Sequence, residues 1–267
     1  MIHNIRNSVK KLQPLIHCIT NPISINQCAN AILAVGARPI MAEHPKEVAE
    51  ITRTAKALLL NLGNITDVRM ESMVLSVKTV KEHKIPIVLD VVGIACSKLR
   101  RDFACELISE ASPTVIKGNY SEIYTLYNIE YQSSGVDADA SLSTDVISKC
   151  AVELARKNHA IILASGKTDI ITDGKQIVWI HNGSPKLSMV TGTGCMLGAL
   201  CACYLSVNQE ISAVVTACVV LGICGELSET KQGLGSFFIN LMDKISTVTQ
   251  KEIEIYAKLE AIEIEDI

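Results

Sequence analysis

The stretch PIVLDVV, residues 86–92, is a short and almost wholly apolar run whose one charged residue is Asp90. Its apolar residues do not alternate with polar ones, as they would in a strand with one face in water. Such a run is typical of a strand covered on both faces, as in a parallel sheet between two layers of helices. The stretch therefore predicts an α/β fold.

The same pattern recurs along the first two thirds of the chain. Further strand-like runs cover residues 14–20, 38–41, 57–62, 114–117 and 160–165. Helical stretches between them are expected at 25–35 after Ser24, at 46–56 with Pro45 in the first turn, from Thr66 or Asp67 to Lys84, and from Ser97 to Ala111. Residues 169–180 indicate an antiparallel hairpin around Asp173-Gly174, and helices are expected to dominate from there onward.

We therefore predict one α/β domain over residues 1–267. A mostly parallel sheet would have helices on both faces and an antiparallel hairpin near one edge.

The composition excludes several functional classes. The 267 residues carry a net charge of −3, which is not the basic footprint of a nucleic-acid-binding protein. The basic cluster Lys98, Arg100 and Arg101 is interpreted as a solvated helix face. We expect no targeting segment and no membrane partner, because the most apolar stretch, residues 211–225, is short for a membrane span and is better interpreted as a buried helix.

The ten cysteines do not have the spacing of a metal site or a disulfide framework. No CxxC pair occurs, and no histidine lies at zinc-site spacing from them. They are interpreted as small core residues with free thiols. That number of free thiols predicts a reducing compartment and hence a cytoplasmic location.

Polar residues and glycines follow each strand-like run. In an open α/β sheet, ligands bind at the carboxyl ends of the strands. Residues of this kind also mark any turn from a strand to a helix, but their recurrence after six runs favours a ligand-binding edge. They are Thr20, Asn21, Met41, Asn61, Gly63, Asp90, Gly93, Lys117, Gly118, Asn119, Ser165 and Gly166.

The segment VTGTGC, residues 190–195, opens a long apolar helical run. Free main-chain N–H groups at a helix start, beside glycines that let a ligand approach, form a site for an anion. The segment lacks the lysine of a Walker loop, and Gly192, Gly194 and Gly198 are spaced one residue too widely for a dinucleotide fingerprint. By itself it does not identify a ligand.

The segment KGNYSE, residues 117–122, allows two interpretations. Asn119 and Glu122 lie one helical turn apart, so they could serve a hydrated Mg²⁺ ion or a phosphate. They could equally be the N-cap and the third residue of a capping box. Asp90, at the end of an apolar strand, requires a cation or a strong hydrogen-bond partner.

These motifs together resemble the ribokinase-like small-molecule kinases. The segments VTGTGC, LDVVG (89–93), KGNYSE and GLGSF (233–237) carry that resemblance, and residues 14–48 resemble the hydroxyethylthiazole kinase family in particular. The resemblance extends from about residue 14 to residue 245. It implies a three-layer ribokinase-like fold and ATP- and Mg²⁺-dependent phosphorylation of the thiazole hydroxyl in thiamine salvage.

The resemblance also implies roles for individual residues. Asp90 and Glu122 match the metal side, and Asn119 belongs with Glu122 to the NxxE motif at the phosphates. Lys117 and Ser165 fall at ATP-contacting positions.

The thiazole side and the catalytic loop are implied in the same way. Met41 and Gly192 match thiazole-contacting positions, and Asn21 and Gly63 are expected in the same pocket. The main-chain amides of the loop formed by Gly192, Thr193, Gly194 and Cys195 would hold the charge on the transferred group. Cys195 stands where most ribokinase-like enzymes have an aspartate.

The sequence departs from the family pattern at three positions. Lys117 replaces an arginine, Val91 the proline of DPVG, and Leu234 the proline of GPGSF. Lysine keeps the charge but loses the two-pronged hydrogen bonding of arginine. The family is typically a homotrimer with sites between subunits.

Two other functions stay open from the sequence. Cys195 could be a covalent nucleophile, although no histidine is identified as its base. The protein could also be a thiazole or nucleotide sensor with little catalytic activity.

Overall fold

The computed structural model describes residues 2–131 and 142–264 of the chain and contains one nine-stranded sheet. The strand order across the sheet is β2-β1-β3-β4-β5-β6-β7-β8-β9. The strands are β1 (Leu15–Ile19), β2 (Arg38–Ile40), β3 (Ala57–Asn61), β4 (Ile87–Asp90), β5 (Val115–Asn119), β6 (Ile161–Ser165), β7 (Asp169–Thr172), β8 (Gln176–Ile180) and β9 (Leu259–Glu263). The six predicted strands and the hairpin are confirmed.

The sheet is parallel from β2 to β6 and antiparallel from β6 to β9. The hairpin β7–β8 therefore lies near one edge, as expected, but β9 covers it and forms the edge itself. Helices dominate after residue 180, as expected, but β9 is a further strand there that the sequence did not predict. The sequence of β9 is LEAIE, and all five residues are exposed, so no apolar pattern identified it as a strand.

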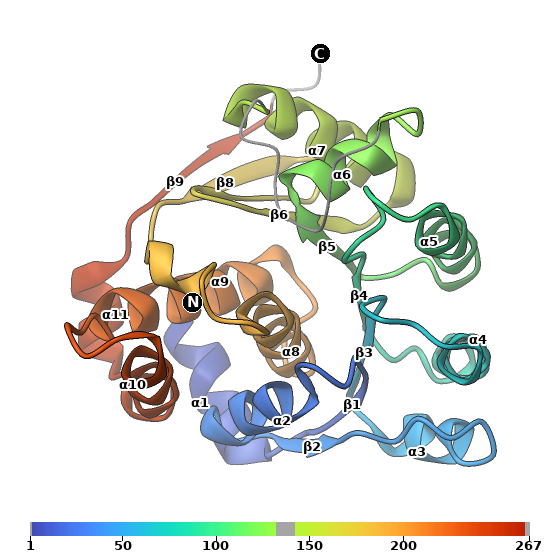
Figure 1. The fold of residues 1–267 in the computed structure, drawn as a ribbon, viewed down its shortest axis with the longest axis horizontal. Helices are drawn as coiled ribbons and strands as arrows, with labels where there is room; N and C mark the ends of the chain where they lie inside the picture. The colour runs from blue at the N-terminus through green and yellow to red at the C-terminus, as the bar shows by residue number, and fades with distance from the viewer. Residues whose placement is uncertain (1, 132–141, 265–267) are drawn as a thin grey trace.

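Helices cover both faces of the sheet (Figure 1). One layer contains α1 (Ile2–Leu12), α2 (Ile25–Ala34), α8 (Thr193–Leu205), α9 (Ile211–Leu227), α10 (Leu234–Thr247) and α11 (Gln250–Tyr256). The other contains α3 (Val48–Thr54), α4 (Asp67–His83), α5 (Lys98–Ala111), α6 (Tyr120–Tyr127) and α7 (Thr144–Asn158). This is the predicted three-layer arrangement.

Each face of the sheet has its own apolar core. On β3, Leu59 packs into the core under α8 and α9, whereas Leu58 and Leu60 pack into the core under α4 and α5. The interpretation of residues 211–225 as a buried helix is confirmed by α9, whose residues are buried along most of its length. In the described parts of the chain, none of the helices is long and apolar enough to cross a bilayer.

Several helix starts agree with the sequence and one does not. Thr66 and Ser97 cap α4 and α5 through their side chains. Ser24 occupies the N-cap position of α2 without a side-chain capping bond. The placement of Pro45 in the first turn of a helix is wrong, because α3 begins only at Val48.

The basic cluster at the start of α5 is only partly a solvated face. Lys98 is exposed and pairs with Asp102. Arg101 is buried and its guanidinium donates to the carbonyl oxygens of Ile129 and Tyr131, so the interpretation as a solvated face is wrong for this residue. Its role is to hold the segment that follows α6.

Candidate active site

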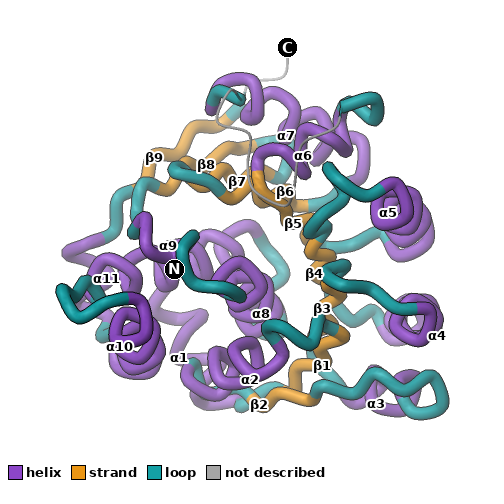
Figure 2. Tube along the Cα trace, in the orientation of Figure 1, coloured by secondary structure: helices purple, strands orange, loops and turns teal. Residues whose placement is uncertain are grey.

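The register of the parallel strands places three polar residues side by side. Asn61 on β3 is paired with Asp90 on β4, and Asp90 is paired with Lys117 on β5. Side chains alternate along a strand, so these residues face the same way as Leu59, Val88 and Val115, which belong to the core under α8. Figure 2 shows α8 lying against this part of the sheet. The row is therefore directed toward the start of α8.

Asp90 and Lys117 form a buried ion pair within this row. Lys117 Nζ lies 3.0 Å from Asp90 Oδ2, and the two side chains are 5% and 1% exposed. Burial is the largest single influence and works against the ammonium, but Asp90, Cys195 and Glu122 together outweigh it and hold the pKa of Lys117 above its ordinary value. Asp90 Oδ1 is buried and has no hydrogen-bond partner in the described parts of the chain.

The start of α8 is an open loop above this ion pair. Gly192 is the N-cap residue with a φ of 94°, a left-handed conformation that suits glycine. Gly194 is exposed, and a Cβ atom built on it would lie 4.0 Å from Lys117 Nζ. The hydroxyl of Thr193 donates to the carbonyls of Leu187 and Val190, so it fixes the loop rather than facing a ligand.

The main-chain amides of this loop and the ammonium of Lys117 thus converge on one place. That arrangement fits an anion such as a phosphoryl group.

Cys195, in the first turn of α8, is half-buried and touches two amide side chains. Its Sγ atom accepts hydrogen bonds from Asn21 Nδ2 and Asn61 Nδ2, both at 3.4 Å. Asn21 follows β1 and Asn61 ends β3. The structure therefore joins Cys195 to the Asp90 row.

Glu122 forms the capping box that the sequence allowed. Asn119 Oδ1 accepts from Glu122 N, and Glu122 Oε2 accepts from Asn119 N at 2.7 Å. Its other oxygen, Oε1, accepts from Gly93 N at 2.6 Å. Burial, and next the nearby charge of Asp90, raise the pKa of Glu122 to about 7.

The capping-box interpretation of the KGNYSE segment is confirmed, and the Mg²⁺ or phosphate interpretation stays a prediction. Glu122 caps α6, and it also lies close enough to Asp90 for their charges to interact.

The other expected site residues lie at the carboxyl ends of their strands. Gly63 presses against the amides of Asn21 and Asn61, where a Cβ atom would come within 2.9 Å of both. Ser165 ends β6 beside Asn119, and its hydroxyl donates to the carbonyl of Gly118. Met41 follows β2, is half-buried and packs against the core under α8.

Sequence reasoning missed the role of Asn61. It was included among the residues at strand ends, but nothing local distinguished it from a turn residue. Its fully buried amide is hydrogen-bonded to Asn21, Gly63, Asp90 and Cys195. The signal was its position one residue beyond a wholly apolar run, as for Asp90.

His17, the one buried histidine among those whose burial the structure describes, lies away from Cys195. His17 Nδ1 contacts Thr52 Oγ1 and its Nε2 contacts the carbonyl of Ala42. Thr52 belongs to α3, in the opposite helix layer from α8. His17 is therefore not placed to act as a base for Cys195.

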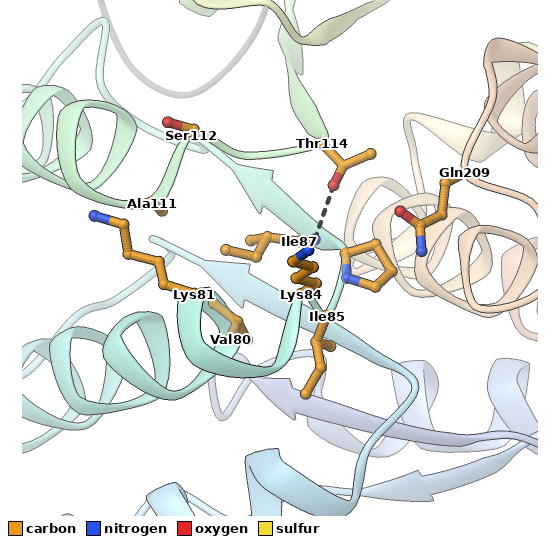
Figure 3. A pocket seen from close by; sticks show the side chains of 10 residues that line it. Val80, Lys81, Lys84, Ile85, Ile87, Ala111, Ser112, Thr114 and Gln209 are labelled. Carbon is orange, nitrogen blue, oxygen red and sulfur yellow. Dashed lines mark hydrogen bonds between the residues drawn. The ribbon is translucent and has the colours of Figure 1, made fainter.

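A surface cavity of about 210 Å³ lies at the other end of the sheet (Figure 3). It is lined by Lys81, Lys84, Pro86, Ile87 and Thr114, among others, at the amino ends of β4 and β5. The residues at the carboxyl ends do not line it, so it is separate from the candidate active site.

Comparison with known proteins gives a consistent result. The model of the hydroxyethylthiazole kinase family matches residues 6–251. A protein named hydroxyethylthiazole kinase 2 from Clostridium botulinum (strain 657 / Type Ba4) is 50% identical over 253 residues, which cover 92% of this chain and 94% of the relative. Hydroxyethylthiazole kinase of Finegoldia magna is 43% identical and covers 95% of this chain, with 91% of its own length matched.

Solved structures agree with the sequence relatives. The structure of a hydroxyethylthiazole kinase protein from Pyrococcus horikoshii OT3 matches with a TM-score of 0.90 and 33% identity, over 98% of this chain and 99% of the other. Pyridoxal kinase from Staphylococcus aureus, solved with AMP-PCP and pyridoxal, matches with a TM-score of 0.66 and 14% identity, over 94% and 99% of the two chains. That second likeness concerns the ribokinase-like fold alone.

Proposed function

The chain belongs to the hydroxyethylthiazole kinase family, and from this premise we propose that it transfers the γ-phosphoryl group of ATP to the hydroxyl of 5-(2-hydroxyethyl)-4-methylthiazole. This reaction is a step of thiamine salvage. The observation that carries the proposal is the convergence of Asp90, Lys117 and the Gly192–Cys195 loop at the carboxyl ends of β4 and β5. We treat the whole chain as one catalytic domain.

The residues at the start of α8 would stabilise the phosphoryl group during its transfer. Phosphoryl transfer depends on alignment and charge neutralisation more than on a strong base. The main-chain amides of Thr193, Gly194 and Cys195, in the first turn of α8, would face the charge that develops on that group, and Lys117 would supply a positive charge beside them. Ser165 and Asn119, one row further along β6 and β5, would lie on the nucleotide side.

The residues present fit a Mg²⁺ ion at Asp90. Mg²⁺ prefers oxygen ligands and keeps several waters and phosphate oxygens, so it needs only one or two carboxylates from the protein. Asp90 Oδ1 is a buried carboxylate oxygen that lacks a hydrogen-bond partner in the described parts of the chain. Both oxygens of Glu122 already accept main-chain hydrogen bonds, so Glu122 suits a metal-bound water better than the ion itself.

When bound, Mg²⁺ would neutralise phosphate charge. Asp90 and Glu122 hold their own places through Lys117, Asn61 and the main chain.

The thiazole would bind on the α2 side of the loop. Gly192 lies against α2, since a Cβ atom on it would lie 3.2 Å from the side chain of Ser24, and Gly63 lies against Asn21. Met41 would complete the pocket, as the family resemblance implies. The amide pair and the side chain of Met41 suit a small, weakly polar ring. Its hydroxyethyl arm would then point toward Cys195.

We also propose the family's quaternary structure and a cytoplasmic location. Adjacent helices α2 and α10 carry exposed apolar side chains, among them Leu33 and Ile239, as is typical of a subunit interface. Size-exclusion chromatography with light scattering should give the mass of a homotrimer.

The ten cysteines are all free, which suits a reducing compartment.

The alternative in which Cys195 is a covalent nucleophile has less support. A nucleophilic thiol needs a neighbouring base. The two side chains that donate hydrogen bonds to the sulfur, Asn21 and Asn61, are amides and cannot act as a base for its proton. A sensor without catalytic activity is the second alternative.

One assay separates these functions. ADP release is measured with Mg-ATP in the presence and absence of the thiazole. Thiazole-dependent release supports the kinase, whereas binding of either ligand without release supports a sensor and overturns the proposal.

Glu122→Gln and Asp90→Asn should each lower turnover by about a hundredfold or more, the scale of removing a preorganised electrostatic group. Near-normal turnover in both variants would contradict the metal assignment.

A further inference from the structure

The buried amide of Asn61 has one definite orientation. Its Oδ1 atom accepts a hydrogen bond from Gly63 N at 2.9 Å, and a main-chain N–H can only donate. The other end of the amide must therefore be the NH₂ group. That group donates to Asp90 Oδ2 at 3.0 Å and to Cys195 Sγ at 3.4 Å.

The orientation of Asn21 is fixed in the same way. Its Oδ1 atom accepts from the main-chain N–H groups of Ile23 and Ser24, both at 3.1 Å. Its NH₂ group therefore donates to Asn61 Oδ1 at 2.9 Å and to Cys195 Sγ at 3.4 Å. The two amides form a connected unit, and both direct N–H donors at the same sulfur.

We propose that Asn61, supported by Asn21, is a positioning residue that holds the Cys195 sulfur in place by donating a hydrogen bond to it. The side of the sulfur that the two amides leave free would then face the hydroxyl that receives the phosphoryl group. Cys195 is half-buried and follows the exposed Gly194, so this remaining direction lies on the open side of the loop. The inference rests on the proposed function, since the hydroxyl in question is that of the thiazole.

The same NH₂ group also links Cys195 to Asp90. One hydrogen goes to the carboxylate and the other to the sulfur, so a single rigid amide sets the separation of the two groups. Asn61 is 0% exposed and ends a strand within the sheet, which leaves its side chain little freedom to move. A displacement of about 1 Å in such a site can lower a rate by about a hundredfold.

The main test removes the amide in two backgrounds. Asn61→Ala should lower kcat by about 10- to 100-fold and leave the KM for ATP within about threefold, because Lys117 still holds the oxygen of Asp90 that Asn61 contacts. Combined with Cys195→Ala, the same substitution should lower kcat by a clearly smaller factor than in the wild type, because only the contact with Asp90 is then left to lose. An equal loss in both backgrounds, or no loss in the first, would overturn the proposal.

Thr114→Val is the matched control. Asn61→Ala leaves the N–H of Gly63 without its side-chain partner, and Thr114→Val does the same to the N–H of Ile87 at the opposite end of the neighbouring strands (Figure 3). The control should lose stability without a change in kcat beyond about twofold. A comparable loss of kcat in the control would show that the effect of Asn61→Ala is only structural, and so would overturn the proposal.

A second measurement does not depend on kinase activity or on a residual rate of Cys195→Ala. Asn61→Leu keeps the approximate shape of the side chain but removes the N–H donor to Cys195 without placing a second carboxylate beside Asp90. Iodoacetamide labelling, located by mass spectrometry, should then become several-fold slower at Cys195 relative to the exposed Cys105, because the reactive thiolate loses a hydrogen-bond donor. An unchanged ratio would overturn the positioning role, whereas a wild-type protein that fails to phosphorylate the thiazole would overturn only the proposed function.

Discussion

Replacing Glu122 with glutamine should remove a pH dependence of folding stability. Burial and the charge of Asp90 raise the pKa of Glu122 from 4.5 to about 7, although its bonds from Gly93 and Asn119 act in the opposite direction. Between those pH values the folded protein holds a proton that the unfolded chain has released. Stability must therefore fall as the pH rises through this window.

The size of the effect follows from the pKa difference. Each unit of difference corresponds to about 1.4 kcal/mol, so a rise from 4.5 to about 7 removes about 3 kcal/mol of unfolding free energy by the upper end of the window. Below the lower value both states are protonated and the contribution vanishes. Above the upper value the full penalty remains, because the buried carboxylate is then charged.

The assay is urea-induced unfolding of the wild type and Glu122→Gln at several values between about pH 5 and about pH 8. The wild-type free energy relative to the variant should fall by about 2–3 kcal/mol across this range. A constant difference between the two proteins would refute the reasoning, since burial would then not disfavour the charged form of Glu122.

The chain provides a matched control in its second capping box. Glu252 occupies the same position in α11 that Glu122 occupies in α6, but it is partly exposed, whereas Glu122 is buried. Main-chain and side-chain bonds from Thr249 lower its pKa, so it is ionised in both states throughout the range. Glu252→Gln should therefore differ from the wild type by the same amount at every pH in the range, and its own contribution should be lost only as the pH falls through its lowered value.

Three further predictions concern the ion pair, the thiol and the helix packing. Lys117→Met leaves Asp90 as an uncompensated buried carboxylate and should cost about 3–5 kcal/mol in urea unfolding, whereas Lys117→Arg should keep most of the stability and of the ATP use; equal losses would contradict the ion-pair argument. Cys195→Ala or Cys195→Ser should slow thiazole-dependent ADP release without abolishing it, and Cys195→Asp should be active, whereas an inactive aspartate variant with a covalent adduct on the wild-type thiol by intact-mass spectrometry would favour a nucleophile. Gly222→Ala should lower the free energy of unfolding by about 1–3 kcal/mol, because its Cβ would lie 2.8 Å from a main-chain oxygen. Gly235→Ala, with open space around its Cβ, should leave that free energy unchanged or raise it by up to about 1 kcal/mol. Melting temperatures in the opposite order would refute the packing argument.

Much of the fold followed from the sequence because buried strands and helix starts have local signals. Apolar runs identified β1 to β6, and Asp173-Gly174 identified the hairpin. The strand β9 had no such signal, since its exposed residues gain their conformation only by pairing with β8. The conformation of an edge strand of this kind is determined by its pairing with the neighbouring strand, and no short stretch of sequence indicates that pairing.

The site was predictable as a set of residues but not as a network. The sequence placed Asn61, Asp90 and Lys117 at strand ends, yet their alignment on one face depends on the register between strands. The contact of Asn61 with Cys195 joins residues 134 positions apart. For Glu122, the sequence left a choice between a capping box and a phosphate-side group; the structure confirms the capping box, and the phosphate-side role stays a prediction.

Two departures from the family pattern are physically connected in the structure. The resemblance implies an arginine at the position of Lys117 and the proline of DPVG at the position of Val91. The N–H of Val91 donates to the carbonyl oxygen of Lys117 at 2.8 Å, a hydrogen bond that a proline could not make. The valine therefore adds a tie between β4 and β5 at the residue that carries the altered side chain. Because Asp90 and Lys117 also pair through their side chains at 3.0 Å, the position of the ammonium is held from both its main chain and its charged end. A lysine fixed in this way can present a single charge to a phosphate without the two-pronged geometry that arginine would supply.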